Sequence, residues 1–173
     1  RITFTATDAY SSVQPNPVVT LNGNAATFYQ KVGASYEYRY TLDSFVDPDG
    51  DAPISILAQD VVGNSASFNF TSLLLIDSSV PTVSGLSVFP SFAKDGDTVV
   101  ISFSINDDNG LSSAPTVKVN GHDSIFNDSS GDYYEYVYNV DSPSDPEGPA
   151  TITIAATDVL NNTGTSTSSG LLV

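Results

Sequence analysis

The chain of 173 residues contains no cysteine and no run of hydrophobic residues longer than Leu73–Ile76. Without cysteine, neither a disulfide framework nor a thiolate metal site can form. A run as short as Leu73–Ile76 is far too short to cross a lipid bilayer, so we expect no direct insertion into a membrane. The absence of cysteine suits a long exported repeat protein.

Basic residues and glutamate are also scarce. Five lysines and arginines stand against twenty acidic residues, and the formal net charge of −15 disfavours nucleic acid as a partner. Only Glu37, Glu135 and Glu147 are glutamates; the other seventeen acids are aspartates. Aspartate favours turns and cation-binding loops. Two explanations therefore stay open: a solvated surface suited to salty surroundings, or a set of divalent-cation sites.

Groups for catalysis are few. His122 is the single histidine, and it follows an Asn–Gly turn. No G-x-S-x-G motif occurs, and no Ser-His-Asp arrangement repeats along the chain. We therefore expect that the chain is not an enzyme.

No segment carries the 3.6-residue period of an amphipathic helix, whereas period-two alternation occurs throughout. Turn residues, such as Asn22-Gly23 and Asn120-Gly121, separate the alternating segments, which is typical of an all-β sandwich. We predict strands over residues 1–7, 17–22, 25–29, 35–42, 53–59 and 65–76, and then over 81–89, 97–106, 115–120, 123–127, 133–140, 150–157 and 164–173.

The sequence repeats itself with an offset of 98 residues. The segment 36–40, Tyr-Glu-Tyr-Arg-Tyr, matches 134–138, and 54–61 matches 152–159. A fixed period means one structural unit built twice. The prediction is two tandem immunoglobulin-like β-sandwich domains, residues 1–77 and 78–173, joined by a short junction that Pro81 stiffens.

The first domain is expected to lack its opening strand. Arg1 aligns with Val100, so the counterpart of the strand at 81–89 is missing from the sequence. Two explanations stay open. The chain is a fragment of a longer array whose targeting segment lies outside it, or a neighbouring chain supplies the strand by addition to the free sheet edge.

Several segments resemble one known family. Asp95-Gly-Asp-Thr-Val, Pro115-Thr-Val-Lys-Val-Asn-Gly, the tyrosine strand at 134–138 and Ile152-Thr-Ile-Ala-Ala-Thr-Asp resemble the bacterial Ig-like repeats of large surface adhesins and surface-layer proteins. The resemblance covers nearly the whole chain. It implies an extracellular cell-surface location and neighbouring Ig-like repeats, or another copy of the chain, as partners.

Two acidic loops are candidate calcium sites. Asp47, Asp49 and Asp51 alternate around a glycine turn, a spacing that lets three carboxylates wrap around one Ca²⁺. The second repeat keeps two of the three carboxylates, as Asp145 and Glu147, and loses the third, since Pro149 stands in its place. Asp107 and Asp108 form the second candidate. Neither loop has the glutamate that closes an EF-hand.

Asp60 and Asp158 each precede a tight turn, where we expect their carboxylates to accept hydrogen bonds from the amides of their own turn. The tyrosine rows have two explanations. Exposed rows could stack against sugar rings, whereas inward rows would form the sandwich core. In the second case the opposite strand faces, with Glu37, Arg39, Glu135 and Asn139, would point to solvent. We predict that the rows form the core: Tyr36, Tyr38, Tyr40, Tyr134, Tyr136 and Tyr138.

Three Asn-x-Ser/Thr sequons are candidate glycosylation sites, at Asn69, Asn127 and Asn161. We expect Asn127 and Asn161 in loops, and Asn69 facing water from a strand. Together, these patterns indicate a structural or adhesive segment of an extracellular surface protein: a stalk, a part of a surface layer or a filament subunit. The alternative is a carbohydrate-binding β-sandwich module.

Overall fold

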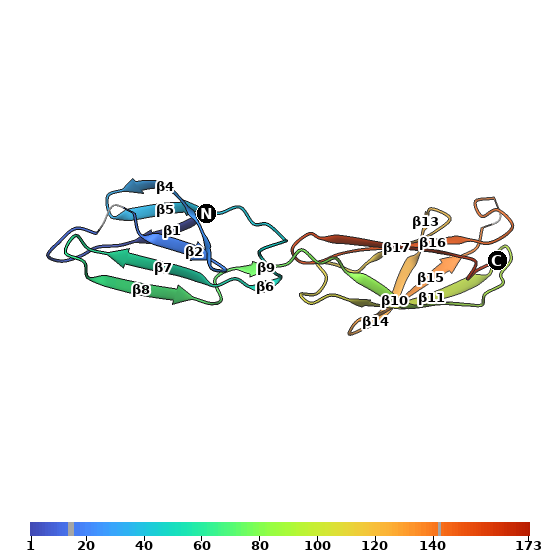
Figure 1. The fold of residues 1–173 in the computed structure, drawn as a ribbon. Helices are drawn as coiled ribbons and strands as arrows, with labels where there is room; N and C mark the ends of the chain where they lie inside the picture. The colour runs from blue at the N-terminus through green and yellow to red at the C-terminus, as the bar shows by residue number, and fades with distance from the viewer. Residues whose placement is uncertain (14–15, 142) are drawn as a thin grey trace. The chain divides into compact units, whose positions relative to one another are not determined.

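A computed structural model describes residues 1–13, 16–141 and 143–173. Over these residues the regular structure is entirely β (Figure 1). The chain divides into two compact units, Arg1–Ser78 and Ser79–Val173. Each unit is an immunoglobulin-like sandwich of two facing antiparallel sheets.

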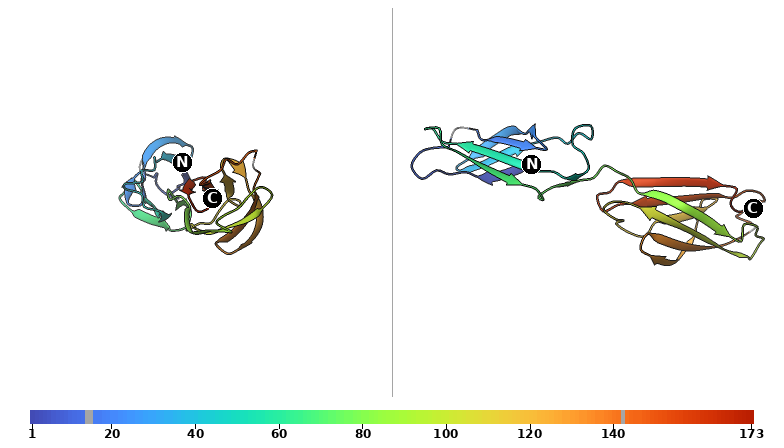
Figure 2. Two further views of the ribbon diagram at one scale, coloured as in Figure 1. Left: turned by 90° about the vertical axis from the view of Figure 1, so that its right-hand side faces the viewer. Right: turned by 60° about the horizontal axis from the view of Figure 1, so that its bottom comes forward.

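The second unit has two four-stranded sheets, in the strand orders β10-β11-β15-β14 and β13-β12-β16-β17. Figure 2 shows β17 in the layer that faces β10. The strands are β10 (Thr82–Phe89), β11 (Thr98–Asn106), β12 (Thr116–Val119), β13 (His122–Asp123), β14 (Ile125–Ser130), β15 (Tyr133–Asn139), β16 (Thr151–Thr157) and β17 (Thr163–Ser169).

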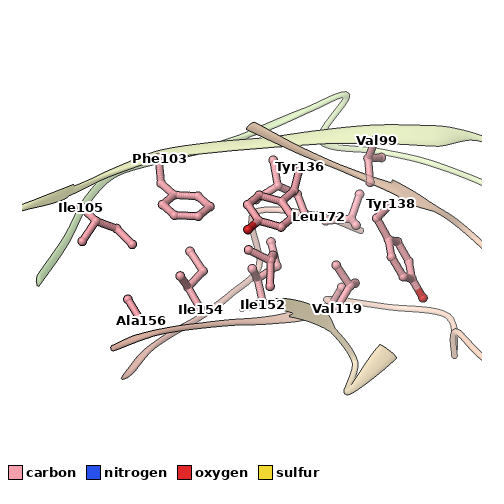
Figure 3. Packing of buried hydrophobic residues seen from close by; sticks show 13 residues of the cluster. Val99, Phe103, Ile105, Val119, Tyr136, Tyr138, Ile152, Ile154, Ala156 and Leu172 are labelled. Atoms are coloured by element: carbon pink, nitrogen blue, oxygen red, sulfur yellow. The ribbon is translucent and has the colours of Figure 1, made fainter. Parts of the chain in front are cut away.

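Alternation along the strands builds the core of this unit, because successive side chains of a strand point to opposite faces. Phe103 of β11 and Tyr136 of β15 face Ile152 and Ile154 of β16 across the two sheets (Figure 3). All four side chains are buried. Gly164 of β17 is also buried, and a side chain there would collide with the backbone carbonyl of Pro81. Glycine therefore lets the start of the unit pack directly on β17.

The first unit repeats this plan, but its two facing sheets have seven strands among the described residues, against eight in the second unit. Its sheets have the orders β1-β5-β4 and β3-β2-β7-β8, and a two-stranded ribbon, β6-β9, lies beside them. The strands are β1 (Ile2–Thr5), β2 (Val18–Leu21), β3 (Asn24–Ala25), β4 (Thr27–Val32), β5 (Ser35–Arg39), β6 (Gly50–Asp51), β7 (Ile54–Gln59), β8 (Ser65–Phe70) and β9 (Leu75–Ile76).

The fold prediction is confirmed, including the missing opening strand. β1 pairs with β5 on one side, and within the described residues no strand pairs with its other edge. In the second unit, β10 pairs with the equivalent edge of β11. Among the described residues, the buried core of the first unit is correspondingly smaller, with eight buried hydrophobic residues against thirteen in the second unit.

Several strand predictions were too long, and two of them ran at least four residues past the observed end. The segment 65–76 is not one strand: Ile54, the first residue of β7, pairs with Phe70, and Pro53 before it has no N–H to extend the ladder. The chain turns away there, and Leu75–Ile76 pairs with Gly50–Asp51 instead. The strand expected over 164–173 ends at Ser169, because Gly170 takes a φ of +82° that directs the chain into a turn.

Matched core substitutions test whether the units are independent. Ile56 and Ile154 occupy the same position in the two cores and are 5% and 1% exposed. We expect Ile56→Ala and Ile154→Ala each to lower the free energy of unfolding of its own unit by about 2–5 kcal/mol. Hydrogen exchange of peptides from β7 and β16 during denaturant unfolding would follow each unit separately. An equal loss in both units from either variant would contradict two closed cores.

Candidate functional site

The buried aspartates Asp60 and Asp158 hold the same corner in both units. One carboxylate oxygen of Asp158 accepts hydrogen bonds from the backbone N–H groups of Leu160 and Asn162, both at 2.8 Å. The other oxygen accepts one from the side-chain amide of Asn162 at 2.7 Å. Asp60 is bonded in the same way to the turn that follows it. The predicted role of both aspartates in their own turns is confirmed.

These bonds keep the corner carboxyl groups ionised. Burial alone would raise the pKa of Asp60 and Asp158, because a low dielectric disfavours charge. The hydrogen bonds from Asn64 and Asn162 outweigh burial and hold both pKa values below the usual value for aspartate. The folded protein therefore holds Asp60 and Asp158 in their negatively charged form.

A second corner involves the buried Asp47 and its half-buried counterpart Asp145. The Asp47 carboxylate accepts hydrogen bonds from the Asp43 backbone N–H at 3.0 Å, the Tyr40 hydroxyl at 3.1 Å and the Asn22 amide at 3.3 Å. Asp145 accepts the equivalent bonds in the second unit. Burial opposes ionisation, but these donors lower the pKa of both carboxyl groups.

Acid should therefore destabilise both units. The folded pKa values of the corner aspartates lie below the unfolded value of about 3.9, so the ionised groups stabilise the fold above that pH. This stabilisation is lost as pH falls through the folded pKa values. We expect the free energy of unfolding to be nearly flat from about pH 7 to pH 5 and to fall below about pH 4.

The control compares Asp158→Asn with Asp132→Asn, whose parent side chain is exposed. Asparagine turns one acceptor of the corner into a donor, so Asp158→Asn should weaken the second unit at pH 7 and show a smaller loss on acidification. Denaturant unfolding at each pH measures both effects. A pH dependence of Asp158→Asn equal to that of Asp132→Asn would contradict a stabilising charge at the corner.

The loop Asp47–Asp51, which the sequence predicted as a calcium site, has its acidic groups in other interactions. Asp47 is only 1% exposed and is fully engaged by its own unit, as described above. Asp49 accepts a hydrogen bond from the backbone N–H of Ser78 at 2.8 Å, and Asp51 is exposed. Among the described residues, these three carboxylates do not converge within 4.8 Å of one another. Calcium binding at this loop stays a prediction.

In the second predicted loop, Asp107 lies near Asp158, a neighbour that the sequence did not indicate. Carboxylate oxygens of Asp107 and Asp158 lie within 4.8 Å of each other in the second unit, while Asp108 is exposed. In the first unit, the Ser11 hydroxyl links the equivalent pair, at 2.9 Å from Asp8 and 3.2 Å from Asp60. The bridge between Leu111 and Asp158 brings this loop to the corner. Two hard oxygen ligands of a cation would fit here.

The tyrosine rows face the cores, as predicted, with Tyr36, Tyr38, Tyr136 and Tyr138 buried and Tyr40 and Tyr134 partly buried against them. Tyr36 and Tyr38 are 0% and 2% exposed, and both rings stack on Phe4. The Tyr38 hydroxyl donates to the Pro17 carbonyl, and Tyr136 donates likewise to Pro115. Rings buried in this way cannot stack on a sugar.

The prediction that Glu37 faces solvent is wrong. Only 9% of Glu37 is exposed, because Gln30 and Arg39 cover its carboxylate at 2.9 and 3.2 Å. The Arg39 guanidinium is itself placed over the Tyr29 ring, 3.3 Å from its centroid. Burial would raise the pKa of Glu37, but the bonds from Gln30 and Arg39 lower it below the usual value.

The three sequons lie on exposed residues. Asn69 is in β8, and Asn161 is in a turn with φ of +71°, as expected. Asn127 is not in a loop: it lies at the bulge of β14, where its amide donates to Glu135 at 2.6 Å. Glycosylation at each asparagine stays a prediction.

A pocket in the second unit has a volume of about 310 Å³ and is lined in part by Lys94, Tyr138, Asp145 and Glu147. Tyr138 and Asp145 are bonded to each other within the structural corner. Burial and the Asp145 carboxylate raise the pKa of Tyr138, while the pKa of Asp145 is lowered. Neither shift prepares a proton donor or acceptor for chemistry near neutral pH.

Comparison with solved structures finds likeness along nearly the whole chain. An adhesin described as Ca²⁺-stabilised, which helps an Antarctic bacterium reach out and bind ice, is 18% identical with a TM-score of 0.50 over 96% of this chain. This chain spans 41% of that one. The extracellular cadherin domains 1–4 of protocadherin gamma B7 are 17% identical over 83% of this chain and 36% of their own, with a TM-score of 0.36. Tandem Ig repeats of Dlar are 16% identical over 88% and 79%, with a TM-score of 0.31.

At 18% identity the likeness to the adhesin concerns the fold alone. The TM-scores of 0.36 and 0.31 are too low to support a conclusion about this chain. No protein-family model matches the sequence, and neither does any curated protein. The part of the chain that the structure describes contains no helix with the length and hydrophobicity that a membrane span requires.

Proposed function

We propose that this chain is a non-catalytic structural segment of an extracellular cell-surface protein, in which immunoglobulin-like sandwiches space or assemble other parts. The main observation behind this proposal is that the chain folds as two successive units, each with a separate hydrophobic core. The perturbed acidic groups support this proposal, because they are engaged in holding corners. The likeness of the fold to a bacterial adhesin agrees with it.

The carbohydrate-binding alternative has lost its main support. It depends on exposed tyrosine rows, and Tyr36, Tyr38, Tyr136 and Tyr138 are all at most 6% exposed. No other observation favours it over the structural role.

Labelling of cells tests the proposed location. An antibody raised against residues 79–173 should bind intact producing cells as strongly as permeabilised ones, because a surface segment is accessible without lysis. Flow cytometry measures the ratio, with an antibody against a cytoplasmic protein as the control. Labelling that appears only after permeabilisation would overturn the extracellular assignment.

We further propose that the second unit binds Ca²⁺ through Asp107 and Asp158. Both are hard oxygen ligands, and their carboxylate oxygens lie within 4.8 Å of each other. A cation between them would offset the repulsion of two negative charges. Calcium would supply stability here, in an already acidic chain, and no chemistry.

Calcium titration tests this site with matched variants. If the dissociation constant is about 0.1–1 mM, as in extracellular modules, 10 mM Ca²⁺ should stabilise the second unit by about 1.4–2.7 kcal/mol. Asp107→Asn should abolish most of this gain, whereas the double variant Asp49→Asn/Asp51→Asn should keep it. Denaturant unfolding with Ca²⁺ and with chelator measures the difference. An equal gain in Asp107→Asn and the wild type would place calcium elsewhere.

A further inference from the structure

The first and last segments of the second unit lie side by side and run in the same direction. β10 and β17 are in contact. Where both begin, the Pro81 carbonyl lies so close to Gly164 that a side chain there would collide with it. Where both end, Val173 is bonded to the chain that follows β10. Since start meets start and end meets end, the two segments are parallel.

Val173 ties the last segment of the unit to the first. Its backbone N–H donates to the Ser91 carbonyl at 2.9 Å, and its own carbonyl accepts from the Ala93 N–H at 3.0 Å. Bonds to the residues on either side of one partner, here Phe92, are the pattern of parallel strands. We name this pairing of residues 91–93 with Val173 the end clasp.

The end clasp is anchored in the core on both sides. Leu172, next to Val173, is 4% exposed, and its carbonyl accepts a hydrogen bond from the Ala150 N–H at 2.8 Å. On the other segment, apolar side chains of β10 pack against the same core, among them Val83 and Val88. Neither segment can therefore slide past the other without drawing side chains out of the core.

Tension between the two ends of the unit would load these contacts along the strands. A pull at Val80, just before β10, and at Val173 draws the two parallel segments in opposite directions. The ladder bonds of β10 to β11 and of β17 to β16 lie across the strands, so they resist this pull together. A pull across the strands would instead load one bond after another, beginning at one end of a ladder.

We propose that the second unit bears tension along its strands, and that the end clasp must break before the unit opens. The end clasp joins the two pulled segments directly, so it takes the load first. Forced unfolding is governed by the rate of unfolding, which is therefore the quantity that the end clasp lowers. The proposal rests on the proposed function for the origin of the tension, because a segment that spaces other parts of a surface protein transmits the force between them.

Single-molecule pulling on the full chain tests the direction of the resistance. The sequence has no cysteine, so introduced cysteines give unique attachment points. Val80→Cys and a cysteine added after Val173 pull along the strands. Val80→Cys and Leu160→Cys pull across them, because Leu160 is in the turn before β17, at the same end as Pro81; both replaced side chains are exposed. At equal force, unfolding along the strands should be about tenfold slower or more, since several backbone bonds must break together.

Two proline variants test the end clasp itself. Val173→Pro removes the N–H that bonds to Ser91, and Ala93→Pro removes the N–H that bonds to Val173. Each should speed unfolding along the strands about 5- to 30-fold. Unfolding across the strands should stay nearly unchanged, because that pull opens the opposite end of the unit first. Denaturant unfolding shows which variants keep the fold, and either one alone is sufficient for the test.

The control is Val117→Ala in β12, a buried residue outside both pulled segments. It should speed unfolding in both directions and leave their ratio unchanged. Equal rates in the two directions for the wild type would overturn the inference. So would a folded proline variant whose effect is equal in both directions, or a ratio that Val117→Ala lowers as much as the proline variants do. Surface labelling would be unaffected by any of these results, so failure here would not bear on the proposed function.

Discussion

Everything in this fold depends on the burial of alternate side chains between two facing sheets. A β-strand presents one face to the core and one to solvent, so a sandwich is stable only where each inward face finds a partner layer. In the second unit, β10 and β17 complete this arrangement, and Ile101 and Phe103 are buried as a result. In the first unit no described strand corresponds to β10, so Ile2 and Phe4 of β1 are only partly buried. This single difference explains its smaller core.

The two units share their polar corners although they differ in their covering. Each has one aspartate that holds the last tight turn, and another that ties a tyrosine and an asparagine to a loop. All four carboxylates are hydrogen-bonded, and all but Asp145 are buried, so they specify geometry as much as they add stability. The strong acidity of the chain is therefore partly structural, because four of its aspartates hold these corners.

Much of this architecture could be predicted from the sequence. Period-two alternation and the 98-residue repeat indicated the sandwiches, and the inward tyrosine rows followed from the same alternation. The partners of single side chains could not be predicted. Glu37 alternates like a solvent-facing residue, yet Gln30 and Arg39 cover it from the neighbouring strand and its own. Asp107 and Asp158 are distant in sequence, and only the fold brings them together. Alternation gives the face of a residue, but strand pairing decides its neighbours.

The tight turn at Asn120 has a consequence for the chemical ageing of the protein. Asparagine followed by glycine is prone to deamidation, in which the next backbone nitrogen attacks the side-chain carbonyl. The amide of Asn120 is restrained at both atoms, since it donates to Asp145 and accepts from the backbone N–H of Thr151. At the position of Thr151 the first unit has Pro53, which has no hydrogen to donate to Asn22. On prolonged storage, the first turn would lose its amide before the second.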